Sequence, residues 1–326
     1  MRALVITGPS DATDTSQVGE LADPEPGPGE VTIDVEYAGI NFVDVMMRRG
    51  DQPYADSFPA YPGDEVAGTV RAVGEGVTGL AAGTRVTAFL TAGGLASIAR
   101  ARAELTVPVP DGVPAPLAAA TPAVLATGYL LLTQAARFRA GDRVLVHSAS
   151  GGVGSAVAQL VPVLGGGQLI GTVGRASKVP TAIDAGYAAA FARDANYPDR
   201  VRAAAGGGVD VVLDALGAGE LDNDLALAAP GGRIVLFGNA TGGAPATLPH
   251  MGRLMGGNLS VGGFSISNLS RAAPARVADA MARCLDLLAS GRVGLAVTEV
   301  DGLAAVPAVH QLLAEGRGRG KYVVRI

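Results

Sequence analysis

Apolar and polar residues alternate in short runs along the first third of this 326-residue chain, and turn residues separate the runs. Such runs occupy Val31–Tyr37, Val66–Val73 and Arg85–Leu90, with Gly, Pro and Asp between them. Alternation with this punctuation predicts strands that bury one face. We therefore expect a β-rich first region, of the small barrel or sandwich kind.

The pattern changes near residue 123, where apolar runs begin to alternate with helical segments. Nearly continuous apolar strands indicate a parallel sheet covered on both faces, and strand–helix alternation indicates a doubly wound α/β fold. The expected strands are 143–147, 168–173, 189–191, 209–214, 233–237, 259–263 and a closing strand at 322–326. The expected helices are 153–164, 176–186, 221–228 and 274–290.

Length and composition narrow the class of protein. A chain of 326 residues favours two domains, and 48% hydrophobic content excludes a disordered chain. The 47 glycines follow no G-X-Y period, which excludes collagen. With 25 basic and 30 acidic residues, the net charge of −5 provides no basic field for nucleic acid or an anionic membrane. A single cysteine, Cys284, excludes an intramolecular disulfide and a Cys-based zinc site.

One segment, residues 112–136, carries no charge. Pro114, Pro116 and Pro122 interrupt its first half, so the remaining stretch is shorter than the ~20 residues that a membrane span needs. We expect a buried core helix there and no membrane partner. The N-terminus becomes polar too soon for a secretory signal, so a cytoplasmic protein is expected.

The most informative segment is VLVHSASGGVGSAVAQL, residues 144–160. A buried strand is followed by a Gly-rich turn and a helix, with Ala149, Gly151 and Gly154 in the G-x-G-x-x-G spacing. The first small residue permits the tight turn, the second lets the backbone approach a pyrophosphate, and the third lets the helix pack on the strand. Helix N–H groups then bind the anion. The alternative is a Gly-rich turn without a ligand. Pro162 predicts a kink or early end of this helix.

The end of the next strand indicates which dinucleotide binds. A site for NAD places Asp or Glu about 20 residues after the glycines, to bond the ribose hydroxyls. Here the segment GTVGRASK, residues 171–178, has no acid and carries Arg175 and Lys178, one of only two lysines in the chain. Two cations suit a ribose 2′-phosphate, so the sequence predicts NADPH. A solvated basic turn is the alternative.

These features together identify a resemblance. The chain resembles the zinc-independent quinone oxidoreductase branch of the medium-chain dehydrogenase/reductase superfamily over nearly its whole length. The resemblance is carried by AGINFVDVMMRRG (38–50), YPGDEVAGTVRAVGEGV (61–77), HSASGGVGSAVAQL (147–160), GTVGRASK (171–178), PGGRIVLFGNATG (230–242) and GRGRGKYVV (316–324).

The resemblance implies an α/β protein with two domains: a GroES-like, β-rich catalytic domain from residues 1–122 and 264–326, and a Rossmann-type dinucleotide-binding domain from residues 123–263. Zinc-dependent relatives have Cys where this chain has Asn41 and His-Glu where it has Asp64–Glu65. Zinc prefers thiolate and imidazole ligands, so no metal is expected. A carboxylate cluster of Asp44, Asp64 and Glu65 is the alternative.

Without a metal Lewis acid, the feasible chemistry is hydride transfer from NADPH to a quinone or an α,β-unsaturated carbonyl. The resemblance implies catalytic roles for Asn41, Tyr54 and Thr127, with Asn41 and Thr127 near the nicotinamide. The predicted cofactor-binding residues are Asn41, Thr127, Ser150, Gly151, Gly152, Val153, Gly154, Gly174, Arg175, Lys178, Arg193, Phe237, Gly238, Asn239, Phe264 and Arg317.

The chain departs from the family pattern at three places. Gln52 stands where relatives often have a Tyr that donates a proton or contacts the substrate, and Tyr54 follows two residues later. A second family Tyr is absent from Gly94–Leu95–Ala96. A Tyr that contacts the 2′-phosphate is replaced by Arg193, which would strengthen the preference for NADPH.

Two other functions stay open. The motif HSASGGVG also resembles the enoyl reductase domains of polyketide synthases, so the substrate could be a carrier- or CoA-bound intermediate. A non-catalytic NADPH-binding protein is the third possibility, supported by the lost Tyr positions. Relatives often dimerise through the last strand of the dinucleotide domain, so a homodimer through residues 259–263 is expected.

Overall fold

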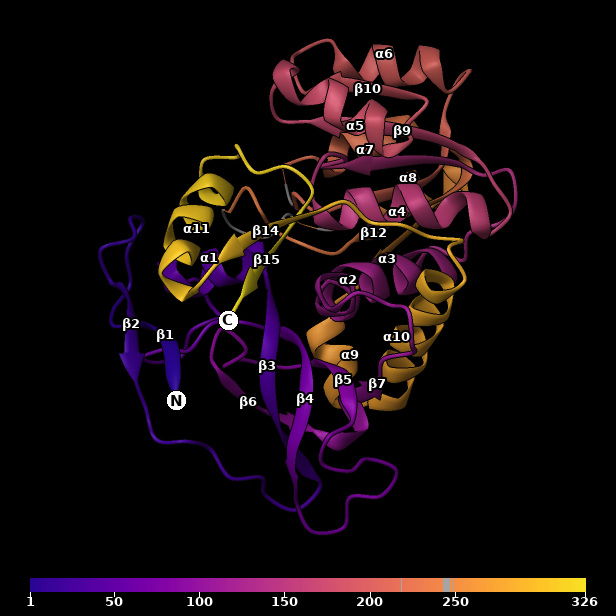
Figure 1. The fold of residues 1–326 in the computed structure, drawn as a ribbon. Helices are drawn as coiled ribbons and strands as arrows, with labels where there is room; N and C mark the ends of the chain where they lie inside the picture. Colours follow the sequence, from indigo (N-terminus) through magenta and orange to yellow (C-terminus); the bar gives the residue numbers. More distant parts are fainter. Residues whose placement is uncertain (218, 243–246, 248) are drawn as a thin grey trace. The chain divides into compact units, whose positions relative to one another are not determined.

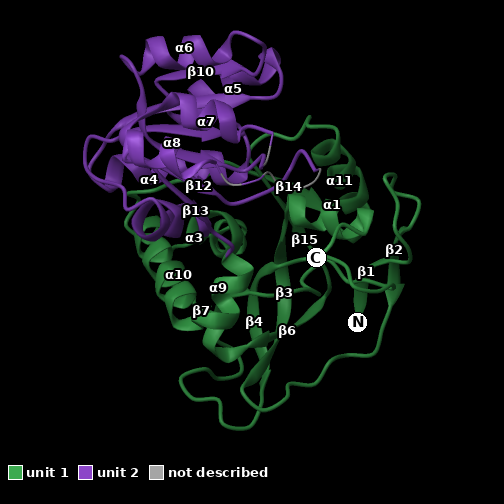
Figure 2. Ribbon diagram, turned by 180° about the vertical axis from the view of Figure 1, so that it is seen from behind, with its two compact units in different colours: residues 1–126, 266–326 green, residues 127–265 purple. Residues whose placement is uncertain are grey.

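A computed structural model describes residues 1–217, 219–242, 247 and 249–326 of the chain. They divide into two compact units, residues 1–126 with 266–326 (unit 1) and residues 127–265 (unit 2), shown in Figure 2. The domain boundaries predicted from the sequence lie a few residues before these.

Unit 1 is built on a seven-stranded sheet in the order β14-β15-β3-β4-β5-β7, with β6 also paired to β3 (Figure 1). Only the β14–β15 pair is parallel. A separate antiparallel ribbon joins β1 to β2. The strands are β1 (Arg2–Ile6), β2 (Ser16–Glu20), β3 (Glu30–Ile40), β4 (Glu65–Val73), β5 (Arg85–Phe89), β6 (Ile98–Arg102), β7 (Thr106–Pro108), β14 (Val297–Asp301) and β15 (Lys321–Arg325).

The long strand β3 shows why the alternating pattern folds this way. Ile33 and Val35 are buried in the core of unit 1, while Asp34 and Glu36 between and after them are exposed. The helices of this unit are α1 (Phe42–Arg49), α2 (Ala115–Ala119), α9 (Ile266–Ala272), α10 (Pro274–Ala289) and α11 (Val306–Ala314), with helical turns η1 (Ala103–Leu105), η2 (Thr121–Leu125) and η5 (Leu303–Ala305).

Unit 2 contains a six-stranded parallel sheet in the order β10-β9-β8-β11-β12-β13. Numbered along the chain this is 3-2-1-4-5-6, the strand order of dinucleotide-binding doubly wound sheets. The strands are β8 (Arg143–His147), β9 (Gln168–Val173), β10 (Ala189–Ala192), β11 (Val209–Asp214), β12 (Ala228–Leu236) and β13 (Ser260–Gly263).

The helices of unit 2 alternate with these strands (Figure 1). They are α3 (Ala126–Leu130), η3 (Leu131–Ala135), α4 (Gly152–Val163), η4 (Ala176–Lys178), α5 (Val179–Ala185), α6 (Tyr197–Ala204), α7 (Leu221–Leu227) and α8 (Met251–Gly257). Pro162 lies in the last turn of α4, so the expected early end of that helix occurs at Val163. The predicted α/β class, with a β-rich part and a doubly wound parallel sheet, is confirmed.

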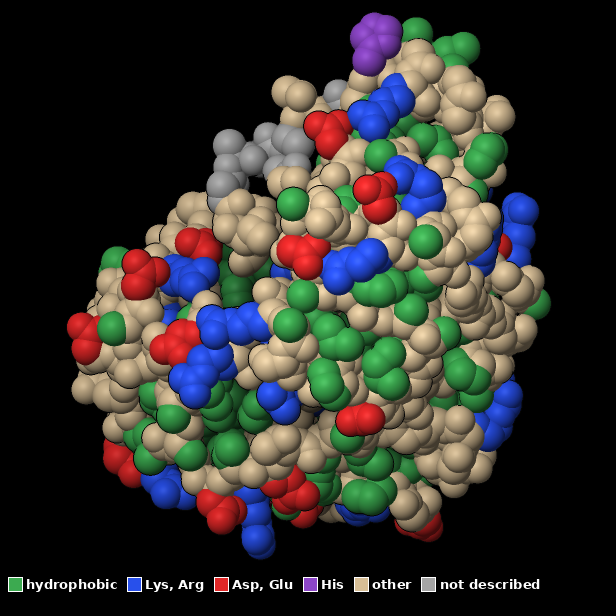
Figure 3. Space-filling model, turned by 90° about the horizontal axis from the view of Figure 1, so that it is seen from above, with side chains coloured by type: hydrophobic (Ala, Val, Ile, Leu, Met, Phe, Trp, Pro, Cys, Tyr) green, Lys and Arg blue, Asp and Glu red, His purple; other side chains and the backbone are tan. Residues whose placement is uncertain are grey.

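The uncharged segment 112–136 folds into short consecutive helical turns rather than one long helix. Among the described residues, no helix is both long and apolar enough to cross a bilayer. On the face drawn in Figure 3, basic and acidic side chains are interspersed rather than separated by sign. That mixing accords with a net charge of −5 and gives this face no basic surface for nucleic acid.

Candidate functional site

The Gly-rich turn joins the end of β8 to the start of α4 in unit 2 and is tied to the neighbouring strand. The Ala149 N–H donates to the Thr172 carbonyl of β9 at 3.0 Å, and the Gly151 N–H donates to the Ser148 carbonyl at 2.9 Å. A Cβ on Gly171 would lie 2.5 Å from the Ala149 Cβ, so β9 needs glycine there to accept the turn.

Gly154 is required by packing. A Cβ at this position would lie 2.5 Å from the Ala149 carbonyl oxygen and 2.7 Å from the Ser148 carbonyl oxygen, both of them backbone atoms. The buried Tyr187 hydroxyl donates to the Gly154 carbonyl at 2.8 Å and secures the same turn from the other side. The third small residue of the motif therefore brings helix and strand together, as the spacing predicts.

The first turn of α4 provides the anion-binding groups. The N–H groups of Gly152, Val153 and Gly154 have no acceptors within the helix, because the first turn of any helix lacks them. Ser150 is buried beside them. These N–H groups lie at the positive end of the dipole of α4, directly after strand β8. Such unpaired donors fit the pyrophosphate of a dinucleotide.

Three cationic residues gather at the carboxyl end of β9. Arg175 and Lys178 follow the strand directly, in the turn that leads to α5. The Arg193 guanidinium comes from the end of β10: its Nη1 lies 3.4 Å from Thr172 Oγ1, and its Nη2 lies 3.4 Å from the position that a Cβ on Gly174 would take. Residues 171–178 contain no acid to bond a ribose diol.

The ends of β11 and β12 pack backbone to backbone. The Phe237 N–H donates to the Asp214 carbonyl at 2.8 Å, and a Cβ on Gly238 would lie 2.6 Å from the Ala215 carbonyl oxygen. Gly217, with φ +94°, faces Asn239 in the same way. At the next strand the Phe264 N–H donates to the Leu236 carbonyl at 2.9 Å. Phe237, Gly238, Asn239 and Phe264 thus stand at the carboxyl edge of the sheet, where doubly wound folds bind ligands.

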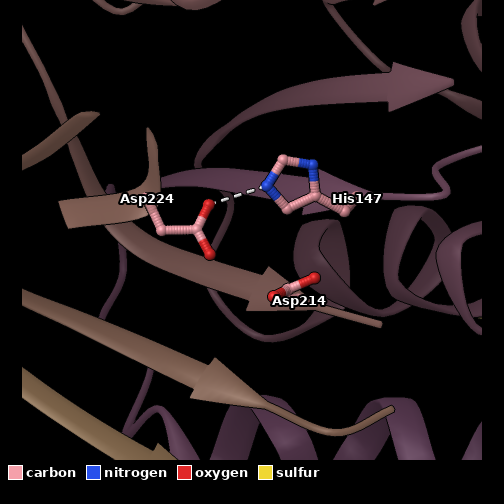
Figure 4. Close-up of side chains that lie close together, drawn as sticks. All are labelled: His147, Asp214 and Asp224. Carbon is pink, nitrogen blue, oxygen red and sulfur yellow. Dashed lines mark hydrogen bonds and ion pairs between the residues drawn. The ribbon is translucent and has the colours of Figure 1, made fainter. Parts of the chain in front are cut away.

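A buried polar group lies directly beneath the Gly-rich turn (Figure 4). His147 Nε2 lies 2.7 Å from Asp224 Oδ1, and His147 Nδ1 lies 2.7 Å from Thr172 Oγ1. Asp214, at the end of β11, completes the group, which we call the histidine cluster. One ring nitrogen of His147 and one carboxylate oxygen each of Asp214 and Asp224 lie within 4.8 Å of one another.

Burial and charge set the protonation of the histidine cluster. Burial alone lowers the pKa of His147, but the hydrogen bond and charge of Asp224, with Asp214 and Glu220, outweigh it and raise the pKa above its ordinary value. Burial, together with the charge of Asp224, raises the pKa of Asp214 to about 6, against the lowering effect of His147 and two backbone N–H groups. The hydrogen bond and charge of Asp224 therefore favour the protonated form of His147.

A second polar group lies in unit 1, which we call the lysine cluster: the buried Lys321 and Glu65 with the half-buried Asn41 and Asp64. The Lys321 ammonium lies 2.5 Å from Glu65 Oε1 and donates to Asn41 Oδ1 at 2.6 Å and the Ile40 carbonyl at 3.0 Å. The Asn41 amide donates to Asp64 Oδ1 at 2.7 Å and Glu65 Oε1 at 2.9 Å. Every polar atom of the Asn41 side chain thus has a partner within unit 1.

The lysine cluster stands at the positions where zinc-dependent relatives, by the resemblance above, bind their metal. Here Asn41 and Glu65 are bonded to an internal ammonium, whose charge would repel a divalent cation. Burial, then the charges of Glu65 and Asp44, raise the pKa of Asp64 to about 8, although Lys321 and Asn41 lower it. The raised pKa favours the protonated form of Asp64, which weakens the carboxylate pair that a divalent ion would bind.

The remaining predicted residues occupy varied positions. The Thr127 hydroxyl, on α3 of unit 2, is buried and makes no hydrogen bond within the described residues. Tyr54 lies half-buried in the turn after α1. Arg317 is exposed and bonds Glu315 at 2.9 Å. Leu95, at the second lost Tyr position, is buried in the core of unit 1.

Sequence reasoning named Asn41, and it grouped Asp64 and Glu65 in the alternative carboxylate cluster, but it missed Lys321 and the histidine cluster, although both left a signal. His147 and Asp214 are the polar residues that end the apolar runs VLVH and VVLD, and the ends of parallel strands meet at one edge of the sheet. Lys321 was visible as the second of two lysines, in a strand that is otherwise apolar at its centre. No spacing rule, however, places residue 321 beside residue 41.

Comparison with known proteins identifies the family. Residues 27–111 match the model of the alcohol dehydrogenase GroES-like domain, and residues 152–285 match that of the zinc-binding dehydrogenase. Rat quinone oxidoreductase is 36% identical over 222 residues, 67% of each chain. The two units and the turn define a two-domain, dinucleotide-binding oxidoreductase fold. The chain belongs to the quinone oxidoreductase branch of the medium-chain dehydrogenase/reductase superfamily.

Solved structures show the same architecture. A mycobacterial protein, Rv1454c, complexed with NADPH, has a TM-score of 0.90 at 32% identity and full coverage of both chains. Escherichia coli quinone oxidoreductase complexed with NADPH has a TM-score of 0.90 at 28% identity, again over both whole chains. Among curated proteins, mouse synaptic vesicle membrane protein VAT-1 homolog-like is 36% identical, and the matched region spans 57% of its length.

Proposed function

We propose that this protein is an NADPH-dependent reductase that transfers hydride to a quinone or an α,β-unsaturated carbonyl without a catalytic metal. One observation carries the proposal: Arg175, Lys178 and Arg193 stand at the carboxyl end of β9, where a site for NAD would place an acid. Two solved relatives of the same fold were complexed with NADPH, which supports the same cofactor here.

The residues that would hold the cofactor follow from the geometry. The first-turn N–H groups of α4 would bind its pyrophosphate. Gly151 has no side chain, so the backbone of the turn can approach the pyrophosphate; a Cβ there would lie 3.2 Å from the Ser148 carbonyl oxygen. The cations after β9 would bind the 2′-phosphate by charge-assisted hydrogen bonds. When bound, NADPH supplies the hydride.

Side chains of the protein would then stabilise the substrate as it accepts the hydride. Negative charge collects on the carbonyl oxygen as hydride adds to the β-carbon, so the site needs a hydrogen-bond donor there. The buried Thr127 hydroxyl, which has no partner among the described residues, supports such a role or a bond to the carboxamide. The Asn41 amide is already bonded in the lysine cluster, so we assign it to orient that cluster. Tyr54 is the proposed proton donor.

A second candidate function has a specific observation in its favour. A polyketide synthase protein, NorB of Streptomyces orinoci, is 36% identical over 91% of this chain, which matches 13% of that protein. An enoyl reductase that acts on a carrier- or CoA-bound intermediate would use the same hydride chemistry. An NADPH-oxidation screen across quinones, simple enones and acyl thioesters separates the two, and no turnover with any class would favour a non-catalytic, cofactor-binding role.

Cofactor preference is tested by replacing Lys178 with Ala. The loss of one charged hydrogen bond should weaken NADPH binding by roughly 1.5–3 kcal/mol and leave NADH binding nearly unchanged. Fluorescence titration of both cofactors measures the difference. Lys178→Arg is the matched control, because it keeps the charge and should retain most of the preference. Equal binding of NADH and NADPH by the unmodified protein would contradict the assignment.

We also propose that two copies pair through β13. This strand is the last of the six in unit 2, is largely exposed, and borders a groove of about 310 Å³ lined by residues of β12 and β13. An unpaired strand edge is a template for a second copy. Light scattering on the purified protein at micromolar concentration should give twice the chain mass, and a monomer would contradict the pairing.

A further inference from the structure

The proposed function leaves the histidine cluster unused. His147 is the last residue of β8 and is 1% exposed, so it lies directly beneath the turn that would bind the pyrophosphate. Asp224 reaches it from α7 and Thr172 from β9 (Figure 4 shows the His147–Asp224 contact). A fully buried ion pair that only stabilised the fold would be a costly choice, because apolar residues of similar volume often serve as well.

A metal ion does not account for these side chains. Asp214 already accepts the Leu216 N–H at 2.6 Å and the Gly217 N–H at 3.2 Å, and both ring nitrogens of His147 are engaged. A cation would have to displace one of these contacts to reach the lone pair of a ring nitrogen. Within the described residues, only Asp224 Oδ2 lacks a partner in this group.

His147 links two neighbouring elements through its ring nitrogens. Its Nε2 lies 2.7 Å from Asp224 Oδ1, and its Nδ1 lies 2.7 Å from Thr172 Oγ1. Thr172 is held at two points: its Oγ1 faces the His147 ring, and its backbone carbonyl accepts from Ala149 in the Gly-rich turn. Thr172 is therefore a fixed point at the end of β9, between the turn and the cations.

Arg193 makes contact with that fixed point. Its Nη1 donates to Thr172 Oγ1 at 3.4 Å, a long hydrogen bond, and its backbone N–H donates to the Val173 carbonyl at 2.9 Å. The guanidinium lies beside Gly174, with Nη2 3.4 Å from the position that a Cβ would take there. Burial lowers the pKa of Arg193, which Glu220, Tyr197 and Asp214 oppose, and a partly desolvated guanidinium favours a bound anion.

We propose that His147, acting through Thr172, is a positioning residue that aims Arg193 at the 2′-phosphate of the cofactor. The chain of contacts is Asp224–His147–Thr172–Arg193, and it joins the ends of β8, β9 and β10. This inference rests on the proposed NADPH site. It predicts that the buried cluster sets the preference between NADPH and NADH, although none of its three inner members carries a charge at the surface.

The test uses Thr172→Val, which removes the hydroxyl and nearly keeps the volume. Dissociation constants for NADPH and NADH are measured by fluorescence titration, and the thermal midpoint of the cofactor-free protein is measured alongside. We expect the NADPH-to-NADH affinity ratio to fall about three- to tenfold, with NADH affinity within twofold of the unmodified protein. Thr172→Ser keeps the hydroxyl and should restore the ratio.

Arg193→Ala tests the 2′-phosphate site separately from the positioning role of His147 and Thr172. The ratio should fall at least as far as in Thr172→Val, because the guanidinium itself is removed. If Arg193→Ala leaves the ratio unchanged, the proposed 2′-phosphate site is wrong at this residue. If Arg193→Ala lowers the ratio and Thr172→Val does not, the positioning role is overturned while the site stands. An equal loss for both cofactors in Thr172→Val, with a lower thermal midpoint, would show a merely structural role and also overturn it.

Discussion

The lysine cluster of unit 1 and the histidine cluster of unit 2 bury similar chemistry in different ways. Each sets one cationic group against carboxylates inside an apolar unit. In the lysine cluster the cation is an ammonium, 1% exposed at its side chain and bonded to three oxygens. In the histidine cluster it is an imidazole, whose charge depends on a proton that titrates far closer to neutral pH than that of lysine.

This difference has a physical consequence. The Lys321 ammonium is bonded to three oxygens, and its removal leaves the buried Glu65 carboxylate without its cation. An imidazole with a raised pKa, next to an aspartate whose pKa is about 6, responds to pH instead. The first arrangement is suited to rigid orientation, and the second couples the carboxyl ends of neighbouring strands to protonation.

The largest expected effect comes from Lys321→Met. The change leaves the fully buried Glu65 carboxylate without its cation, which should lower the free energy of unfolding by about 3–5 kcal/mol. Urea unfolding at neutral pH measures the loss. The double variant Lys321→Met with Glu65→Gln is the control, because it removes both charges and should recover most of the stability. If Lys321→Met alone lowers the free energy of unfolding by less than a typical surface substitution, the Lys321–Glu65 pair is not needed for stability.

A smaller effect, with a distinct pH dependence, is expected for Asp214→Asn. The pKa of Asp214 is raised from its ordinary value to about 6, so its protonated form stabilises the fold below the unfolded pKa near 4, and this stability is lost as pH rises through 6. Relative to the unmodified protein, the variant should therefore gain on the order of 3 kcal/mol between about pH 4 and pH 6, and no more above that range.

Urea unfolding at intervals from pH 4 to pH 8 measures this gain. Asp210→Asn is the matched control on the same strand, because Arg143 holds the pKa of Asp210 below its ordinary value, so no gain over this window is expected there. A difference between Asp214→Asn and the unmodified protein that stays constant with pH would contradict the titration. The two clusters would then differ in their packing and not in their response to pH.

The strand and helix pattern predicted much of the architecture. Alternation in β3 placed Ile33 and Val35 in a core, and the continuous apolar runs of β8 and β11 placed them inside a parallel sheet. These predictions succeed because local periodicity records which faces are buried. The pattern was weaker for short or polar helices such as α6 and α8, whose residues carry too little apolar periodicity to stand out.

In the candidate site, too, some features could be predicted from the sequence and others could not. The spacing of Ala149, Gly151 and Gly154, and the cations of 171–178, are contiguous features that a sequence shows directly. Tertiary structure alone decided that Lys321 lies against Asn41 and Glu65, and that Asp224 and Thr172 meet at His147. The physical reason is that burial and pairing of charges depend on which strand ends and chain ends meet, and such contacts between distant residues leave no period in the sequence.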